Sequence, residues 1–185
     1  MKTKIFENKK QIQNLVERAD DNGTTKRLVS LFRKLKKSRV DFYLQLEDLE
    51  QILKWKLRGQ FGRQLKRRQE NTNKNIIAIT KAAFEIRHTD NDIETKIKLK
   101  LLCTLSGVEI PIASAILTLC FPTQYSVIDF RNWRQVYKTE KQKTNYTTKE
   151  YIEYLKTIKS WAKDFGVTPQ EIDLAIWQED IDDQK

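Results

Sequence analysis

An aspartate at position 129 is the residue whose neighbours best suit it for chemistry. It ends a loop in the segment from 101 to 137, LLCTLSGVEIPIASAILTLCFPTQYSVIDFRNWRQVY, directly before a predicted helix that carries Arg131 and Arg134. The positive end of that helix's macrodipole favours the ionised carboxylate. A fixed carboxylate can stabilise positive charge on a reacting carbon and orient a water molecule. Asp129 is therefore the candidate catalytic residue, and a helix N-cap without a catalytic role is the alternative.

Metal and thiol chemistry have little support in the other residue types. Cys103 and Cys120 lie in apolar stretches, where cysteine usually behaves as a small buried hydrophobic residue. Two cysteines and the single His88 cannot supply a four-thiolate cluster, and their spacing does not suggest a zinc site. We interpret His88 as an exposed or helix-capping residue. The sequence therefore predicts no metal and no cofactor.

The charge of the chain is concentrated in its first part. The formal net charge is +10. Residues 1–70 contain 19 Lys and Arg against 9 Asp and Glu, whereas residues 71–185 contain 16 of each. Two clusters account for most of the excess, Lys26, Arg27, Arg33, Lys34, Lys36, Lys37 and Arg39 in one, and Lys54, Lys56, Arg58, Arg63, Lys66, Arg67 and Arg68 in the other. This asymmetry favours a polyanionic partner such as nucleic acid; a solvated basic surface is the alternative.

The spacing of apolar residues predicts an all-α protein, a compact bundle of about nine or ten helices. Apolar residues recur three and four positions apart in almost every segment. Gly107 is expected to end one helix. Thr147 with Glu150, and Thr168 with Pro169 and Glu171, have the pattern of capping boxes that start two C-terminal helices, with Gly166 between them. The small residues 113–115 would let a neighbouring backbone approach their helix closely.

The segment from 101 to 137 resembles the helix-hairpin-helix DNA glycosylase superfamily, which has an endonuclease III-like fold, here without an iron–sulfur cluster. The hairpin corresponds to Leu105, Ser106, Gly107, Val108 and Glu109, and the Asp-bearing loop with its basic helix corresponds to Asp129, Arg131 and Arg134. The resemblance implies that backbone N–H groups at Gly107, Val108 and Ile110 bind a DNA phosphate. It also implies that Asp129 stabilises an oxocarbenium ion and its attacking water.

Two positions depart from the family pattern. Glu109 replaces the second hairpin glycine and places a negative charge near the expected phosphate. Pro111 corresponds to the lysine with which some family members form a Schiff base and nick the strand. The resemblance therefore implies a monofunctional glycosylase that hydrolyses an N-glycosidic bond and leaves an abasic site.

Further DNA contacts and the base pocket are expected around Trp55. We predict that Lys54, Lys56, Arg58, Arg63 and Arg67 bind DNA together with Arg131 and Arg134. A flipped base needs an aromatic platform, and Trp55 and Tyr125 are the candidates. Trp161 and Trp177 are assigned to the core of the C-terminal helices.

The chain is expected to form one unit with a basic N-terminal extension. We predict a helical extension at 1–40, a glycosylase-like domain at 41–180 and an acidic tail at 181–185. The predicted partner is double-stranded DNA with a damaged or modified base, bound by a cytoplasmic monomer of base excision repair without membrane attachment. Two alternatives remain, a non-catalytic helix-hairpin-helix nucleic-acid-binding module and a protein-interaction domain.

Overall fold

The protein is all-helical in the computed structural model, which describes residues 5–20, 22–62, 65–139 and 143–184. These residues form ten α-helices and one 3-10 helix, and no strand occurs among them. The elements are α1 (Lys9–Ala19), α2 (Thr24–Ser38), α3 (Leu46–Leu57), η1 (Arg58–Gln60), α4 (Leu65–Arg68), α5 (Asn73–Glu85), α6 (Asn91–Leu102), α7 (Ile110–Cys120), α8 (Phe130–Tyr137), α9 (Thr148–Phe165) and α10 (Pro169–Asp182). The predicted all-α class is confirmed.

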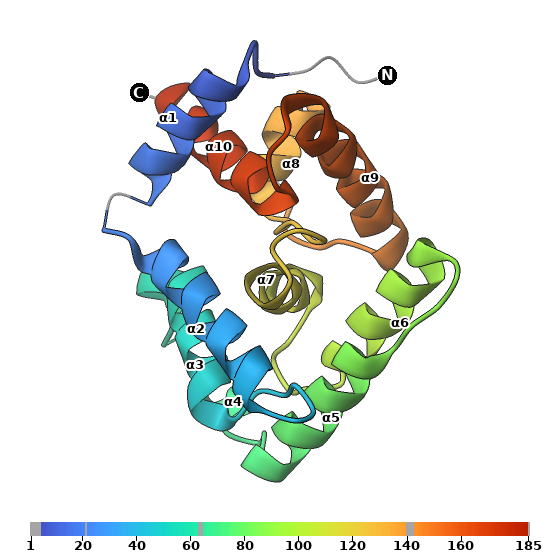
Figure 1. Ribbon diagram of the computed structural model, residues 1–185. Helices are drawn as coiled ribbons and strands as arrows, with labels where there is room; N and C mark the ends of the chain where they lie inside the picture. The colour runs from blue at the N-terminus through green and yellow to red at the C-terminus, as the bar shows by residue number, and fades with distance from the viewer. Residues whose placement is uncertain (1–4, 21, 63–64, 140–142, 185) are drawn as a thin grey trace.

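Helix α7 is the centre of the molecule. In Figure 1 it is seen end-on, and the other helices surround it. Its sequence IPIASAILTLC is apolar on all sides, as a helix buried on every face requires, and the residues from Ala113 to Cys120 are all buried. Because 113–115 are small, neighbouring segments can pack close to the α7 backbone.

The helices around α7 form two groups. One contains α8, α9 and α10, and α1 packs against α10 although it lies at the other end of the chain (Figure 1). The other contains α2 to α6, with α2 and α3 packed against α7 and α5 against α6. The first 40 residues contribute Phe6, Ile12, Leu15, Leu28 and Phe32 to the same hydrophobic core as the rest of the chain. Their helices are therefore integral to the fold rather than appended to it.

The helix boundaries in the C-terminal part agree with the predicted caps. Thr147 with Glu150 and Thr168 with Glu171 both form complete capping boxes. Gly166 ends α9 in the left-handed conformation, with φ of 63°. Gly107 also has a positive φ, 77°, but α6 ends earlier than expected, at Leu102. The residues from 103 to 109 therefore form a longer turn than the sequence indicated.

The last helix extends into the segment predicted as an acidic tail at 181–185. Helix α10 continues to Asp182, and the carboxylate of Asp180 is fully buried. Asp180, near the end of α10, is thus part of the interior of the protein.

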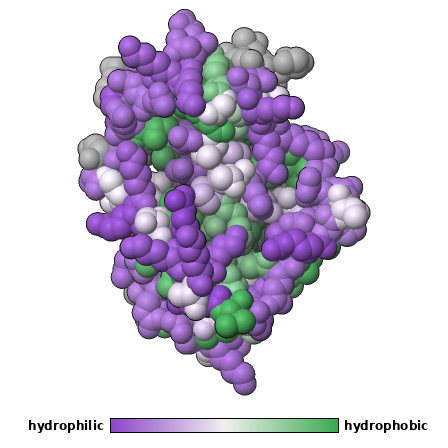
Figure 2. All heavy atoms as spheres, viewed as in Figure 1, coloured by the Kyte–Doolittle hydropathy of each residue, from purple (hydrophilic) through white to green (hydrophobic). Residues whose placement is uncertain are grey.

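The molecular surface is mainly hydrophilic on the face shown in Figure 2, where paler and apolar residues gather in a central hollow. No helix in the described part of the chain combines the length and apolar character needed to cross a membrane.

Candidate functional site

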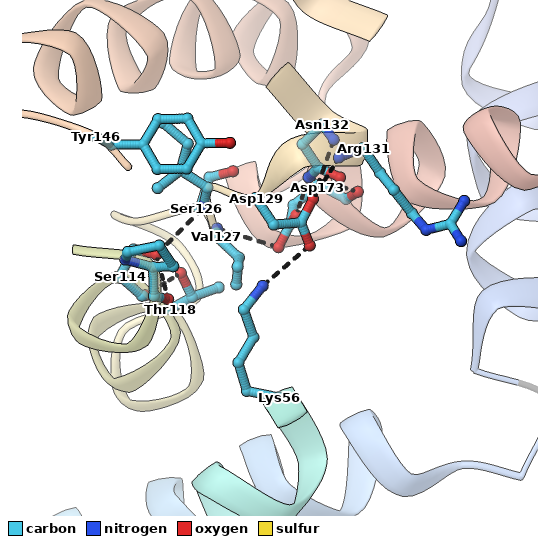
Figure 3. A network of polar contacts seen from close by, with 12 residues as sticks. Lys56, Ser114, Thr118, Ser126, Val127, Asp129, Arg131, Asn132, Tyr146 and Asp173 are labelled. Atoms are coloured by element: carbon cyan, nitrogen blue, oxygen red, sulfur yellow. Dashed lines mark hydrogen bonds and ion pairs between the residues drawn. The ribbon is translucent and has the colours of Figure 1, made fainter. Parts of the chain in front are cut away.

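Asp129 lies at the start of α8, where both of its carboxylate oxygens are bound. It is the N-cap residue, and Oδ1 accepts hydrogen bonds from the backbone N–H groups of Arg131 at 3.0 Å and Asn132 at 3.1 Å. Oδ2 forms an ion pair with Lys56 Nζ at 2.9 Å (Figure 3). The Asp129 side chain keeps 20% of its accessible surface. Its carboxylate is therefore fixed in orientation while one part still faces solvent.

The loop before Asp129 is fastened to α7 and α9. Ser114 Oγ, in the small-residue stretch of α7, accepts a hydrogen bond from the Ile128 backbone N–H at 3.1 Å. On the other side, Tyr151 and Tyr154 of α9 donate their hydroxyl groups to the carbonyls of Ser126 at 2.9 Å and Val127 at 2.8 Å. Both tyrosines are fully buried. Hydrogen bonds buried in the protein interior are stronger than those exposed to water, so they hold this loop in one conformation.

A second acid, Asp173 on α10, lies behind Asp129 (Figure 3). It is 5% exposed, and its Oδ2 accepts the Val127 backbone N–H at 3.1 Å. The side-chain amide of Asn132 donates to its other oxygen. Asp173 therefore ties the Asp129 loop to α10, and it brings a second titratable group into the site.

The two acids have opposite pKa shifts. Burial alone would raise the pKa of Asp129, but the Lys56 ammonium and the backbone N–H groups of Asn132 and Arg131 outweigh burial and hold that pKa below its usual value. Burial, followed by the negative charge of Asp129, raises the pKa of Asp173 to about 8. At neutral pH Asp129 is ionised and Asp173 is largely protonated. Such separation of two acids is typical of sites that use them differently.

Two neighbouring cavities lie beside this pair of acids. The smaller has a volume of about 50 Å³ and is lined by Thr25, Trp55, Lys56, Arg58, Val127, Asp129, Asp173, Leu174 and Trp177. The larger, of about 540 Å³, shares Thr25, Trp55, Arg58 and Trp177 with it. The smaller cavity has room for one or two water molecules, whereas the larger is within the size range of ligand pockets.

Aromatic and basic side chains form the common wall of the two cavities. The Arg58 guanidinium lies 4.3 Å from the centroid of the Trp177 ring. Trp55 is held by a hydrogen bond from its Nε1 to Thr25 Oγ1 at 3.0 Å. The structure therefore brings Trp55, Lys56 and Arg58 into one cavity lining with Asp129. Trp177, which was assigned to the core, also lines this site, and that assignment was wrong.

Several predicted site residues lie elsewhere or have other partners. Tyr125 is buried at 3% exposure and lines a different cavity, so the structure does not bring it to Asp129. Lys56 contacts the Asp129 carboxylate rather than facing solvent. Lys54 and Arg67 are exposed, and Lys54 pairs with Glu50. Arg63 lies outside the described residues.

Arg131 and Arg134, expected to contact DNA, both bind the buried Asp180 of α10. Arg131 Nη1 lies 2.9 Å from Asp180 Oδ2, and Arg134 Nη2 lies 2.6 Å from the same oxygen. Arg134 Nε donates to Asp180 Oδ1 at 2.7 Å. A carboxylate without exposure needs such partners, so these arginines have a structural role that their spacing on the helix did not show.

The turn after α6, where the sequence predicted a DNA-binding hairpin, is held by hydrogen bonds to Ser106. The Asn71 side chain exchanges two hydrogen bonds of 2.8 Å with the Ser106 backbone. Gly107 and Val108 are buried, Ile110 is half-buried, and the Val108 N–H donates to the Leu105 carbonyl at 3.0 Å. That N–H group is therefore used within the turn itself.

The sequence interpretation missed Asp173, Tyr151 and Tyr154. One signal was present for Asp173, because it is an acidic residue inside the apolar run Ile172 to Ile176 of a predicted helix. An acid on a buried helix face needs a partner or a proton. The tyrosines gave no comparable signal, since aromatic residues at helical spacing usually pack in the core.

Within the described residues, no group of three or more His, Cys, Asp or Glu side chains is placed to hold a metal ion.

Comparison with known proteins gives no further assignment. No known protein family, curated protein or solved structure matches this chain.

Proposed function

We propose that this protein is a monofunctional DNA glycosylase that hydrolyses the N-glycosidic bond of a base extruded from double-stranded DNA. One observation carries the proposal: the ionised Asp129 carboxylate is fixed beside a cavity that opens toward Trp55 and Trp177. A carboxylate of this kind suits the positive charge that develops on the sugar when a glycosidic bond breaks. The segment from 101 to 137 resembles the helix-hairpin-helix glycosylases, and this resemblance also supports a glycosylase with Asp129 as its catalytic residue.

In this proposal the base occupies the larger cavity, against Trp55 and Trp177, and the sugar faces Asp129. The carbon–nitrogen bond breaks as water adds its oxygen to the sugar carbon. The base leaves with the bonding electron pair and takes up a proton from water, and the hydroxyl group stays on the sugar. Asp129 stabilises the oxocarbenium character of the sugar and orients the water. Stacking on tryptophan holds the extruded base.

The position of Lys56 supports base removal without strand nicking. A strand-nicking glycosylase needs a free amine that attacks the sugar carbon. Here the Lys56 ammonium is bound to Asp129 at 2.9 Å, and position 111, where the family carries such a lysine, is proline. An ammonium group in an ion pair is not a nucleophile. The expected product is an intact strand with an abasic site.

The DNA backbone would be bound by basic side chains near the cavity and on α2. Arg58 lines the cavity, and Lys54 and Arg67 are exposed nearby in the sequence. Helix α2 also presents a row of exposed cations, Lys26, Arg27, Arg33, Lys34, Lys36 and Lys37. Cations of this kind supply sequence-independent affinity for phosphates.

A non-catalytic helix-hairpin-helix nucleic-acid-binding module is the second candidate. The small size of the inner cavity favours it, because about 50 Å³ has no room for a sugar ring unless Arg58 or Trp177 moves. In that case Asp129 would serve only as the N-cap of α8.

Duplexes that contain uracil, alkylated purines, 8-oxoguanine, mismatches or modified cytosines separate the two candidates. Each duplex is incubated with the protein and then treated with alkali, which cleaves the strand at abasic sites. The glycosylase is expected to give alkali-dependent cleavage of at least one duplex. Asp129→Asn should abolish that cleavage while DNA binding persists, because asparagine caps a helix as well as aspartate does.

Asp41→Asn is the matched control, since Asp41 is exposed and pairs with Lys81 outside the site. This variant should cleave like the parent protein. Absence of product on every duplex, with DNA binding retained, would overturn the enzyme and leave the binding module. Cleavage that survives in Asp129→Asn would remove the proposed role of this residue.

A further inference from the structure

A second large cavity, of about 530 Å³, lies among α2, α6, α9 and the loop after α7. It shares no lining residue with either cavity beside Asp129. Its charged lining residues are Lys36, Arg87, Glu94, Lys98, Lys159 and Lys163. Five cations and one carboxylate thus face one cavity.

The single acid in this lining is already neutralised. Glu94 Oε1 lies 2.5 Å from Lys98 Nζ. Lys98 keeps only 2% of its side-chain surface exposed, so this pair belongs to the cavity wall. The other four cations have no further carboxylate among the described lining residues. The lining of this cavity therefore carries a surplus of about four positive charges.

The ammonium groups gather around two aromatic rings. Lys36 Nζ lies 4.5 Å from the centroid of the Phe121 ring, and Lys159 Nζ lies 5.6 Å from that of Tyr125. Lys98 Nζ lies between the rings, 5.7 Å from Phe121 and 5.8 Å from Tyr125. Burial lowers the pKa of both Lys98 and Lys159. Partly desolvated cations that line one cavity favour a bound anion, because the anion would offset their mutual repulsion.

We propose that this cavity binds a small phosphorylated anion, through Lys36 and Lys159 beside the Phe121 and Tyr125 rings and through Lys163 in the same lining. Lysine binds phosphate as a point charge from several directions, and a surplus of about four charges matches a diphosphate or triphosphate group. Neutral donors are also present in the lining at Asn91, Thr95 and Gln124. The volume lies within the range of small-molecule pockets.

A duplex is a poor occupant of the same site. Lys36 and Lys163 are exposed, but Lys98 is almost completely buried and Lys159 is half-buried, so the backbone of a duplex can contact only part of this set of cations. The proposal is independent of base excision at Asp129, because no lining residue of this cavity lines either cavity beside Asp129.

Calorimetric titration of the full-length protein tests this proposal. Inorganic pyrophosphate and ADP are the probes, at about 50 mM salt, where phosphate contacts are strong. The double variant Lys159→Gln with Lys163→Gln should bind both probes at least about tenfold more weakly. The control is Lys149→Gln with Lys156→Gln, which removes two exposed lysines of the same helix outside the cavity lining.

Binding of pyrophosphate as tight as that of ADP would identify a site for the phosphates alone, and tighter binding of ADP would identify a nucleotide site. Both results support the proposal if only the cavity variant loses affinity. The proposal is overturned if neither probe binds, or if both double variants weaken binding equally, since the net charge alone would then explain it. Circular dichroism checks that all variants are folded. Base excision by Asp129 would be unaffected by either result.

Discussion

Among single residues, Asp173 makes the stability of the protein depend on pH. Its pKa of about 8 in the folded state exceeds the usual value near 4 for aspartate. Between these values the folded protein holds a proton that the unfolded chain has released. The free energy of unfolding therefore falls as pH rises, by roughly 1 kcal/mol per pH unit from this residue.

Asp173→Asn should flatten this dependence and gain stability over the parent protein as pH rises from about 5 to about 8. The new amide can be accommodated, because Asn132 Oδ1 is buried without a hydrogen-bond partner among the described residues and can accept from it. Urea unfolding at three pH values in this range measures the slope. Asp41→Asn should keep the parent's slope. An unchanged slope in Asp173→Asn would show that Asp173 is ionised in the folded protein.

Lys56 stabilises the ionised form of Asp129. The resulting contribution to the free energy of unfolding rises with pH, whereas the contribution of Asp173 falls. The lowered pKa of Asp129 stabilises the fold above the usual pKa of aspartate, and the effect is lost as pH falls through the lowered value. Lys56→Met should reduce the free energy of unfolding by about 1–3 kcal/mol at pH 7 and by less near pH 3.

Urea titrations of Lys56→Met at these two pH values make the measurement. Lys54→Met is the matched control on the same helix, since Lys54 pairs with the exposed Glu50. It should change stability by no more than about 0.5 kcal/mol. Equal losses in the two variants would contradict a specific role for the pair of Lys56 with Asp129.

At the scale of elements, the buried Asp180 links α8 to α10. Arg134→Gln removes two of the hydrogen bonds to this carboxylate and leaves it mainly to Arg131. We expect the free energy of unfolding to fall by about 2–3 kcal/mol, with no change in the salt dependence of DNA binding. Arg33→Gln, on the exposed face of α2, should leave the free energy of unfolding nearly unchanged. It should lower the slope of log DNA affinity against log salt by about 1. Urea unfolding and fluorescence anisotropy separate the two roles.

The elements of this fold could be predicted more fully than the site they form. Capping boxes at Thr147 and Thr168, and the N-cap at Asp129, are local patterns in which the first residue hydrogen-bonds to a backbone a few positions away. The pairing of Lys56 with Asp129 joins residues 73 positions apart. Such a contact depends on how helices cross, which the order of residues along the chain does not encode locally.

The partners of the arginines of α8 also could not be predicted from the local sequence. Their spacing indicated a basic face, but whether that face meets solvent or another helix depends on where α10 packs. Asp180 lies directly before the predicted acidic tail at 181–185, in a polar part of the sequence that gave no sign of burial. Only the packing of α10 against α8 shows that this acid lies at zero exposure.

For the whole molecule, the charge imbalance between the two parts of the chain predicts how affinity for DNA should vary with salt. The described cations of α2 lie on its exposed face, whereas residues 71–185 carry no net charge. Replacing Lys34 and Lys37 together by glutamine should lower the slope of log affinity against log salt by about 2 if both contact phosphates. The double variant of Lys149 and Lys156 is the control and should keep the parent's slope. Anisotropy with a labelled duplex over a salt series measures both.

The positions of the four tryptophans make intrinsic fluorescence a measure of ligand binding at the site. Trp55 and Trp177 line the cavities beside Asp129, whereas Trp161 is 3% exposed in the core and Trp133 stacks on Tyr137 with ring centroids 3.9 Å apart. A molecule that enters these cavities displaces water from the indole rings of the first two and leaves the others unchanged. The emission of the unlabelled protein should therefore follow occupancy of the site directly, and Trp133→Phe would lower the constant background signal.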